Sequence, residues 1–157
     1  MKTEIGISEE NLLISIRLLT GILANEMTLY IKTRKFHWNV SGESFMELHK
    51  LFENQYKQLE DSIDEIAERI SKLGGKTIGT MKEFTDLTDL KEVPGKYPQK
   101  LDMLKELLND HNTIIKQLRI DINVATDKSK DAGTADFLTS LMEQHETIAW
   151  ILRRYLS

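Results

Sequence analysis

Two of the four histidines in the chain, His37 and His49, lie twelve residues apart in the segment KFHWNVSGESFMELHKLFE, residues 35–53. An imidazole ring can exchange a proton near neutral pH and can bind a transition metal through a ring nitrogen. Ser41-Gly42 predicts a turn between the two histidines. The segment therefore leaves two possibilities: they are unrelated core residues, or the chain brings two imidazoles to one place.

An acidic face follows on the helix predicted after this turn. At helical spacing one sector of that helix collects His49, Glu53, Glu60, Asp64 and Glu68. Asp64 and Glu68 are four residues apart, so their carboxylates repel each other by roughly 0.2–0.5 kcal/mol. A bound cation would reverse this penalty, and carboxylate oxygen with imidazole nitrogen suits iron, manganese or zinc. The alternative is a solvated acidic face, which Asp61 and Glu65 would extend and which contains Lys57.

The histidines favour the metal interpretation, because an imidazole adds nothing to a face that is merely solvated. His37 would contribute if its helix met this acidic sector in another copy of the chain. The first helix has two apolar faces, and the second of them is expected to need a partner. This second face contains Leu12, Ile16, Leu19, Leu23, Met27 and Tyr30, and His37 continues it. The pattern thus indicates a site at a contact between subunits.

The motif Glu-x-x-His, with which many di-iron proteins hold metals inside one bundle, occurs nowhere in the sequence. His111 and His145 sit in apolar rows of the last two predicted helices and are expected to be core histidines with local hydrogen-bond partners. Glu26 is the one acid near the apolar rows of the first helix that could join them. This trio is too poor in carboxylates for a di-iron centre.

Long helices are predicted to position these residues. Apolar residues recur at helical spacing, and the only prolines, Pro94 and Pro98, fall in one mid-chain segment. Ser8 is the expected N-cap of the first helix, and Gly74-Gly75 are expected to close the second. The predicted helices cover about residues 9–38, 43–73, 81–90, 98–126 and 133 to nearly the end. This order predicts an all-α, ferritin-like four-helix bundle with a short extra helix in the long connection.

Composition narrows the class of protein. The length of 157 residues favours one domain over residues 1–157, with residues 1–8 as a short N-terminal extension. The absence of cysteine excludes disulfides and thiolate metal sites. We expect no apolar run long enough to cross a bilayer and no signal peptide, hence a soluble cytoplasmic protein. The net charge of −4 opposes DNA binding through lysine and arginine.

The stretch LYIKTRKFHWNVSGESFMELHKLFENQYKQLEDSIDEIAERISKLGG resembles the Dps proteins (DNA-binding protein from starved cells), also called mini-ferritins. The resemblance extends through GTMKEFTDLTDL and EQHETIAWILRRYL, so it covers nearly the whole chain. Its most specific part is His-Trp-Asn-Val, a histidine twelve residues on, and Asp-x-x-x-Glu within DEIAERI. It implies a hollow dodecamer that oxidises Fe²⁺, typically with hydrogen peroxide and more slowly with oxygen. The stored ferric mineral would protect against oxidative damage.

The resemblance also implies residue roles. The implied iron ligands are His37 and His49 from one subunit and Asp64 and Glu68 from its two-fold partner. Glu53 falls where the family usually has a supporting acidic residue, although aspartate is common there. Trp38 matches a tryptophan beside the iron that disposes of oxidising equivalents, with interface packing as its alternative role. Glu60 is the one candidate for mineral nucleation.

The segment DKSKDAGTAD, residues 127–136, is similar to the family's acidic pore region. Asp127, Asp131 and Asp136 would then line an entrance for Fe²⁺; the alternative is a polar loop with an aspartate at a helix start. Some family members compact DNA through lysine-rich tails. This sequence carries none, so weak or absent DNA binding is expected. A structural shell with inactive metal sites is a further alternative.

Overall fold

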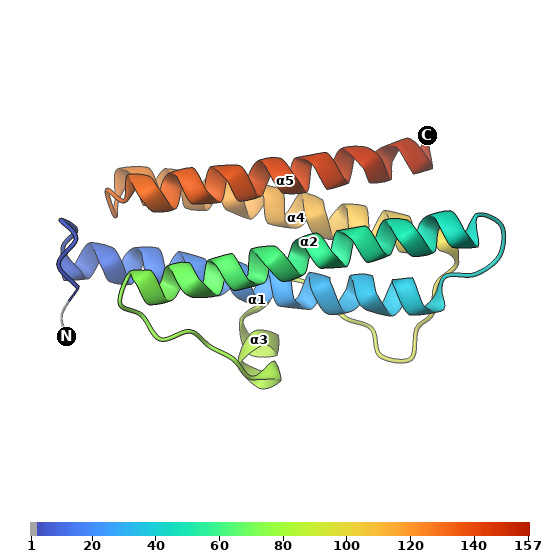
Figure 1. Cartoon of the computed structure of the whole chain (residues 1–157), viewed down its shortest axis with the longest axis horizontal. Coiled ribbons are helices and arrows are strands. Elements are labelled where there is room, and N and C mark those ends of the chain that lie inside the picture. The colour runs from blue at the N-terminus through green and yellow to red at the C-terminus, as the bar shows by residue number, and fades with distance from the viewer. Residues whose placement is uncertain (1–2) are drawn as a thin grey trace.

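A computed structural model describes residues 3–157 as a bundle of four long helices with one short helix beside it (Figure 1). The helices are α1 (Glu9–Asn39), α2 (Phe45–Lys72), α3 (Met81–Leu87), α4 (Lys100–Asp127) and α5 (Ala132–Leu156). α1 and α2 form one antiparallel hairpin, and α4 and α5 form the other (Figure 1). The connection through α3 returns along the outer side of the bundle beside α1 and joins the two hairpins (Figure 1). This architecture confirms the predicted all-α four-helix bundle.

Helix α1 begins where the sequence predicts, because the Ser8 hydroxyl accepts a hydrogen bond from the Asn11 backbone N–H at 3.2 Å. By length and composition alone α1 could span a membrane. That corrects the expectation that no apolar run approaches this length. In the most apolar window of α1, 56% is buried inside the chain. Packing within the bundle therefore accounts for much of its apolar character.

The second apolar face of α1 was expected to need a partner outside the bundle, but the chain itself covers much of it. Leu12, Leu19 and Leu23 are buried within the single chain, whereas Met27 and Tyr30 are half-buried. The expectation of a second partner was wrong for the three leucines. The physical reason is that α1 packs against α2, α3 and α4 together, so more than one of its faces is covered.

Two glycines set the limits of α2. Gly42 has φ +86°, and its carbonyl accepts a hydrogen bond from the Phe45 N–H at 3.1 Å, which forms the predicted turn. Gly74 has φ +85° directly after Leu73, which confirms the predicted left-handed helix end. Between these ends one side of α2 enters the core. Its buried apolar residues are Leu48, Phe52, Leu59, Ile66 and Ile70.

Helix α3 ends at Leu87, three residues before the predicted end. Asn25 of α1 is the reason: its side-chain oxygen accepts hydrogen bonds from the Thr88 hydroxyl at 3.0 Å and the Asp89 N–H at 2.7 Å. These contacts hold the chain extended after α3. The connection is thereby attached to α1, the same helix that carries His37.

Candidate metal centre

The helical hairpin brings His37 and His49 into contact. Their rings stack with centroids 3.8 Å apart at an interplanar angle of 21°. His37 Nδ1–H donates to the His49 carbonyl at 2.8 Å, and His49 Nδ1–H donates to the His37 carbonyl at 2.9 Å. His37 lies in the last turn of α1, where carbonyls lack intrahelical partners. Of the two possibilities that the sequence left, the structure has the imidazoles at one place.

These hydrogen bonds determine where the ring protons sit. A carbonyl oxygen only accepts, so Nδ1 must carry the proton in both rings. In a neutral imidazole Nε2 then keeps its lone pair, which is the form that binds a metal. Within residues 3–157 neither Nε2 atom has a hydrogen bond. The hairpin thus presents two oriented nitrogen ligands.

Aromatic and cationic side chains surround the pair. Tyr56 packs edge-on against His37, with centroids 5.2 Å apart. Arg34 lies over Tyr56 at 4.6 Å and over Trp38 at 5.4 Å. Trp38 is 63% exposed in the isolated chain, so its ring is available to a second subunit. Tyr56 follows His49 by seven residues, about two turns further along α2, and this spacing is the sequence signal for the contact.

Glu53 lies one turn after His49 and is held by two lysines. Lys50 and Lys57 contact its two carboxylate oxygens at 2.8 Å and 2.5 Å. These hydrogen bonds, with Lys50 as the larger cause, lower the pKa of Glu53 to about 2. Glu53 is therefore ionised at physiological pH. A metal bound by Glu53 would have to share its carboxylate with the two lysines.

The predicted acid pair lies far from the histidines in the same chain. Asp64 is fifteen residues after His49 on α2, which at 1.5 Å per residue is about 22 Å along the helix. Asp64 and Glu68 are exposed, and Glu68 pairs with Lys72 at 3.1 Å. Among residues 3–157 no three His, Cys, Asp or Glu side chains are arranged to hold a metal. One chain therefore supplies the nitrogen ligands and the acid pair at separate places.

The three predicted pore aspartates differ in their contacts. Asp131 is buried and caps α5 by accepting a hydrogen bond from the Thr134 N–H at 2.9 Å. It also pairs with Arg69 at 3.3 Å. Burial alone would raise the pKa of Asp131, but the hydrogen bonds from Thr134 lower it overall. Within the chain Asp131 has the helix-start role that the sequence left open, whereas Asp127 and Asp136 are exposed.

The remaining two histidines form a polar cluster in the core. His111 Nδ1 and His145 Nδ1 are 2.8 Å apart, and His145 Nε2 lies 2.5 Å from a carboxylate oxygen of Glu26. All three residues are at most 1% exposed. Burial lowers the pKa of His111 well below its ordinary value, and His145 lowers it further. The structure confirms the predicted core histidines and the participation of Glu26.

Comparison with known proteins places this geometry in a family. The family model for the ferritin-like domain matches residues 16–157. A low-temperature-induced protein of Nostoc sp. is 44% identical over 155 residues, which cover 99% of this chain and 87% of the relative. DNA protection during starvation protein 2 of Bacillus anthracis is 34% identical over 143 residues, covering 90% and 96%.

Solved structures agree with these sequence matches. DpsC from Streptomyces coelicolor covers the whole chain with a TM-score of 0.96 at 26% identity, and 91% of that chain is covered. Dps from Bacillus brevis has a TM-score of 0.90 at 31% identity, with 96% and 100% coverage. Fold and family model together define a ferritin-like protein. Within that superfamily the chain belongs to the Dps family.

Proposed function

We propose that this chain is the subunit of a cytoplasmic, twelve-subunit Dps shell that oxidises Fe²⁺ and stores the ferric product as mineral. Each iron site would combine His37 and His49 of one subunit with Asp64 and Glu68 of its two-fold partner. The observation that carries this proposal is the orientation of the histidine pair. Its Nδ1 atoms are fixed by carbonyls, which leaves both Nε2 lone pairs for a metal.

A two-fold axis accounts for the separation of the two half-sites. The midpoints between His49 and the acid pair fall near residues 56–59 of α2. Antiparallel packing of two α2 helices about an axis there would place each acid pair opposite the partner's histidines. A two-fold contact is self-complementary, so it would complete two sites at once. Tyr30, Ile63 and Asp64 line one groove of the chain, so apolar contact surface adjoins the acid pair.

The residues in this site would favour oxidation through charge. Neutral imidazoles and carboxylates both bind Fe²⁺, and the negative carboxylates of Asp64 and Glu68 stabilise Fe³⁺ more strongly. Each ferrous ion gives up one electron. A peroxide molecule accepts two electrons and two protons, its O–O bond breaks, and two water molecules form. Consuming iron and peroxide together withholds both reactants from hydroxyl-radical chemistry, in line with the stress-protection names of the relatives.

The acidic surface suggests a path for the iron. Asp127 and Asp136 are exposed and could attract Fe²⁺ at a pore, with Asp131 fixing the start of α5 between them. Glu60, also exposed, is the candidate for mineral nucleation. DNA compaction is the less favoured function, because a net charge of −4 per chain repels phosphate. Retardation of plasmid DNA at low salt would contradict this assignment.

Replacement of the acid pair tests the proposal. The variant D64A/E68A should assemble normally and oxidise Fe²⁺ with peroxide at least about 10–100-fold more slowly, because metal ligands are lost. Stopped-flow absorbance measures the rate, and size-exclusion chromatography measures assembly. The matched control D61A/E65A removes two exposed carboxylates, also four residues apart on α2, and should retain the wild-type rate. Equal rates for the two variants would refute the assignment.

A further inference from the structure

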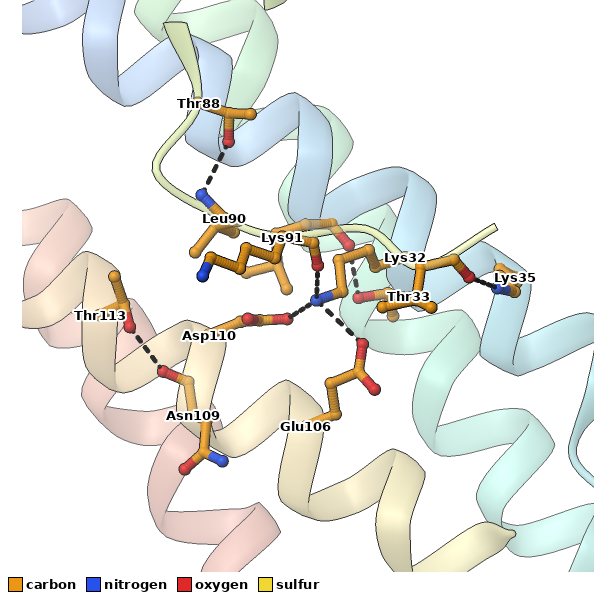
Figure 2. Close-up of polar contacts among 12 residues, drawn as sticks. Lys32, Thr33, Lys35, Thr88, Leu90, Lys91, Glu106, Asn109, Asp110 and Thr113 are labelled. Atoms are coloured by element: carbon orange, nitrogen blue, oxygen red, sulfur yellow. Dashed lines mark hydrogen bonds and ion pairs between the residues drawn. The ribbon is translucent and has the colours of Figure 1, made fainter. Parts of the chain in front are cut away.

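Lys32 is the most completely surrounded cation in the described part of the chain. It lies on α1 and is 5% exposed. Its Nζ is 2.5 Å from a carboxylate oxygen of Asp110, 3.0 Å from one of Glu106, and 2.8 Å from the Lys91 carbonyl oxygen. Figure 2 shows the three contacts converging on Nζ from α4 and from the connection after α3. The contact with the Lys91 carbonyl is a hydrogen bond, and the contacts with the two carboxylates are ion pairs.

The oxygen atoms around Lys32 resemble the ligands of a hard divalent cation. Asp110 and Glu106 are four residues apart on α4, so their carboxylates would repel each other without a cation between them. Two carboxylates and a backbone carbonyl are ligands that Ca²⁺ accepts. Together they carry one more negative charge than a single ammonium neutralises. The surrounding charge therefore suits a cation of higher charge as well.

Burial makes this cluster sensitive to the loss of its cation. Burial raises the pKa of Asp110, while its contact with Lys32 acts in the opposite direction. Removing one partner of a buried ion pair leaves a charge that water cannot solvate. Lys32 differs in this respect from the lysines that form ion pairs on α2 and α3. Their side chains are 57–82% exposed. Such surface pairs contribute little to stability.

Lys32 also links the connection to the bundle. Its bond to the Lys91 carbonyl joins the extended chain after α3 to α1 and α4 at one point. Lys35, one turn further on α1, donates to the Val93 carbonyl at 3.3 Å. Asn25 binds the same connection at Asp89. Three side chains of α1 thus hold successive parts of the connection, and only Lys32 also contacts α4 carboxylates.

We propose that Lys32 is a built-in cation, whose ammonium occupies an oxygen-lined site formed by Asp110, Glu106 and the Lys91 carbonyl. It fastens the connection between α3 and α4 and excludes divalent metal ions from a site away from the proposed iron centre. The inference depends only on these contacts and not on the proposed iron oxidation. The ions that it concerns are hard divalent cations, for which Ca²⁺ is the probe.

Replacement by alanine empties the site while its oxygen atoms remain. K32A should bind one more Ca²⁺ per chain than the wild type, with a Kd on the order of 10⁻⁴–10⁻³ M. Calcium at 10 mM should raise the melting temperature of K32A by about 3–11 °C more than that of the wild type. Without Ca²⁺ the backbone amides of residues 88–93 should exchange hydrogen faster in K32A, and Ca²⁺ should slow them again.

A second substitution identifies the oxygen ligands. K32A/D110N should lose the extra Ca²⁺ and the calcium-dependent slowing of exchange. The proposal is overturned if K32A gains no Ca²⁺, or if its extra site persists in the double variant. If K32A does not fold, the single variant D110N still tests the proposal. It keeps Lys32 and its bond to the Lys91 carbonyl but removes the charge of Asp110. Exchange of residues 88–93 should then be faster than in the wild type and insensitive to Ca²⁺; unchanged exchange in D110N would contradict the proposal.

Discussion

The two histidine pairs of this chain are hydrogen-bonded in opposite ways. His37 and His49 each donate from Nδ1 to the other's backbone carbonyl, and neither Nε2 atom has a hydrogen bond to the part of the chain that the structure describes. His111 and His145 bond to each other through ring nitrogens, and Nε2 of His145 binds Glu26. The first pair is oriented for an external ligand. The second has most of its hydrogen-bonding capacity taken up inside the bundle.

Position along the helices explains part of this difference, because only the His37 carbonyl lies in a last helical turn, whereas the His49 carbonyl lies within α2. His37 lies in the last turn of α1, where a carbonyl is available to a side chain. His111 and His145 lie inside α4 and α5, where backbone carbonyls already serve the helices. Buried there, the two imidazoles must satisfy each other and a carboxylate. The same residue type is therefore a candidate metal ligand beside the hairpin turn and a structural group deeper in the bundle.

The largest expected effect comes from breaking the core pair. H145A should lower the free energy of unfolding by about 3–5 kcal/mol, because it removes a buried side chain and leaves Glu26 and His111 without their hydrogen-bond partner. Chemical denaturation measures this loss, while the folded fraction should still oxidise iron. E26L/H145L removes both partners and should recover much of the stability. A change below about 1 kcal/mol in H145A would contradict the role of the cluster.

A smaller effect concerns pH. The depressed pKa of His111 means that the folded protein stays unprotonated there while the unfolded chain binds a proton below pH about 6.5. The unfolded state then binds more protons, so stability falls as pH falls. Below pH 6.5 His111 should contribute up to about 1.4 kcal/mol of this loss for each pH unit. H111L should flatten the stability profile by that amount; identical profiles would show that His111 does not titrate in this way.

Sequence patterns predicted where the helices lie in the chain better than they predicted which segments the helices contact. Ser8, Gly42 and Gly74 act locally, through a cap or a backbone angle, so their positions predicted helix limits. The end of α3 depends on Asn25, more than sixty residues earlier, and no local pattern contains that contact. The second apolar face of α1, which contains Leu19, shows the same limit of local sequence patterns. Periodicity identifies a buried face but not which helix buries it.

The sequence indicated that His37 and His49 could meet, but not the hydrogen bonds that orient them. On α2 His49 and Asp64 are separated by several turns, so they cannot bind the same metal ion within one chain. A shared site therefore requires a second chain; otherwise the two residues have separate roles. The reciprocal carbonyl bonds of His37 and His49 depend on how the hairpin closes, and they were found only in the structure. Likewise, Lys32 gave no signal in the sequence, because its partners come from distant segments.

The central claim, that two chains share each iron site, is tested most directly by mixing two inactive variants. H37A/H49A lacks the nitrogen ligands, and D64A/E68A lacks the acid pair. In a mixed two-fold pair one site loses everything and the other regains all four residues. Shells co-expressed from both variants in equal amounts should therefore recover about a quarter of the wild-type rate of iron oxidation under random pairing. Mixed shells as inactive as either variant alone would contradict the shared site.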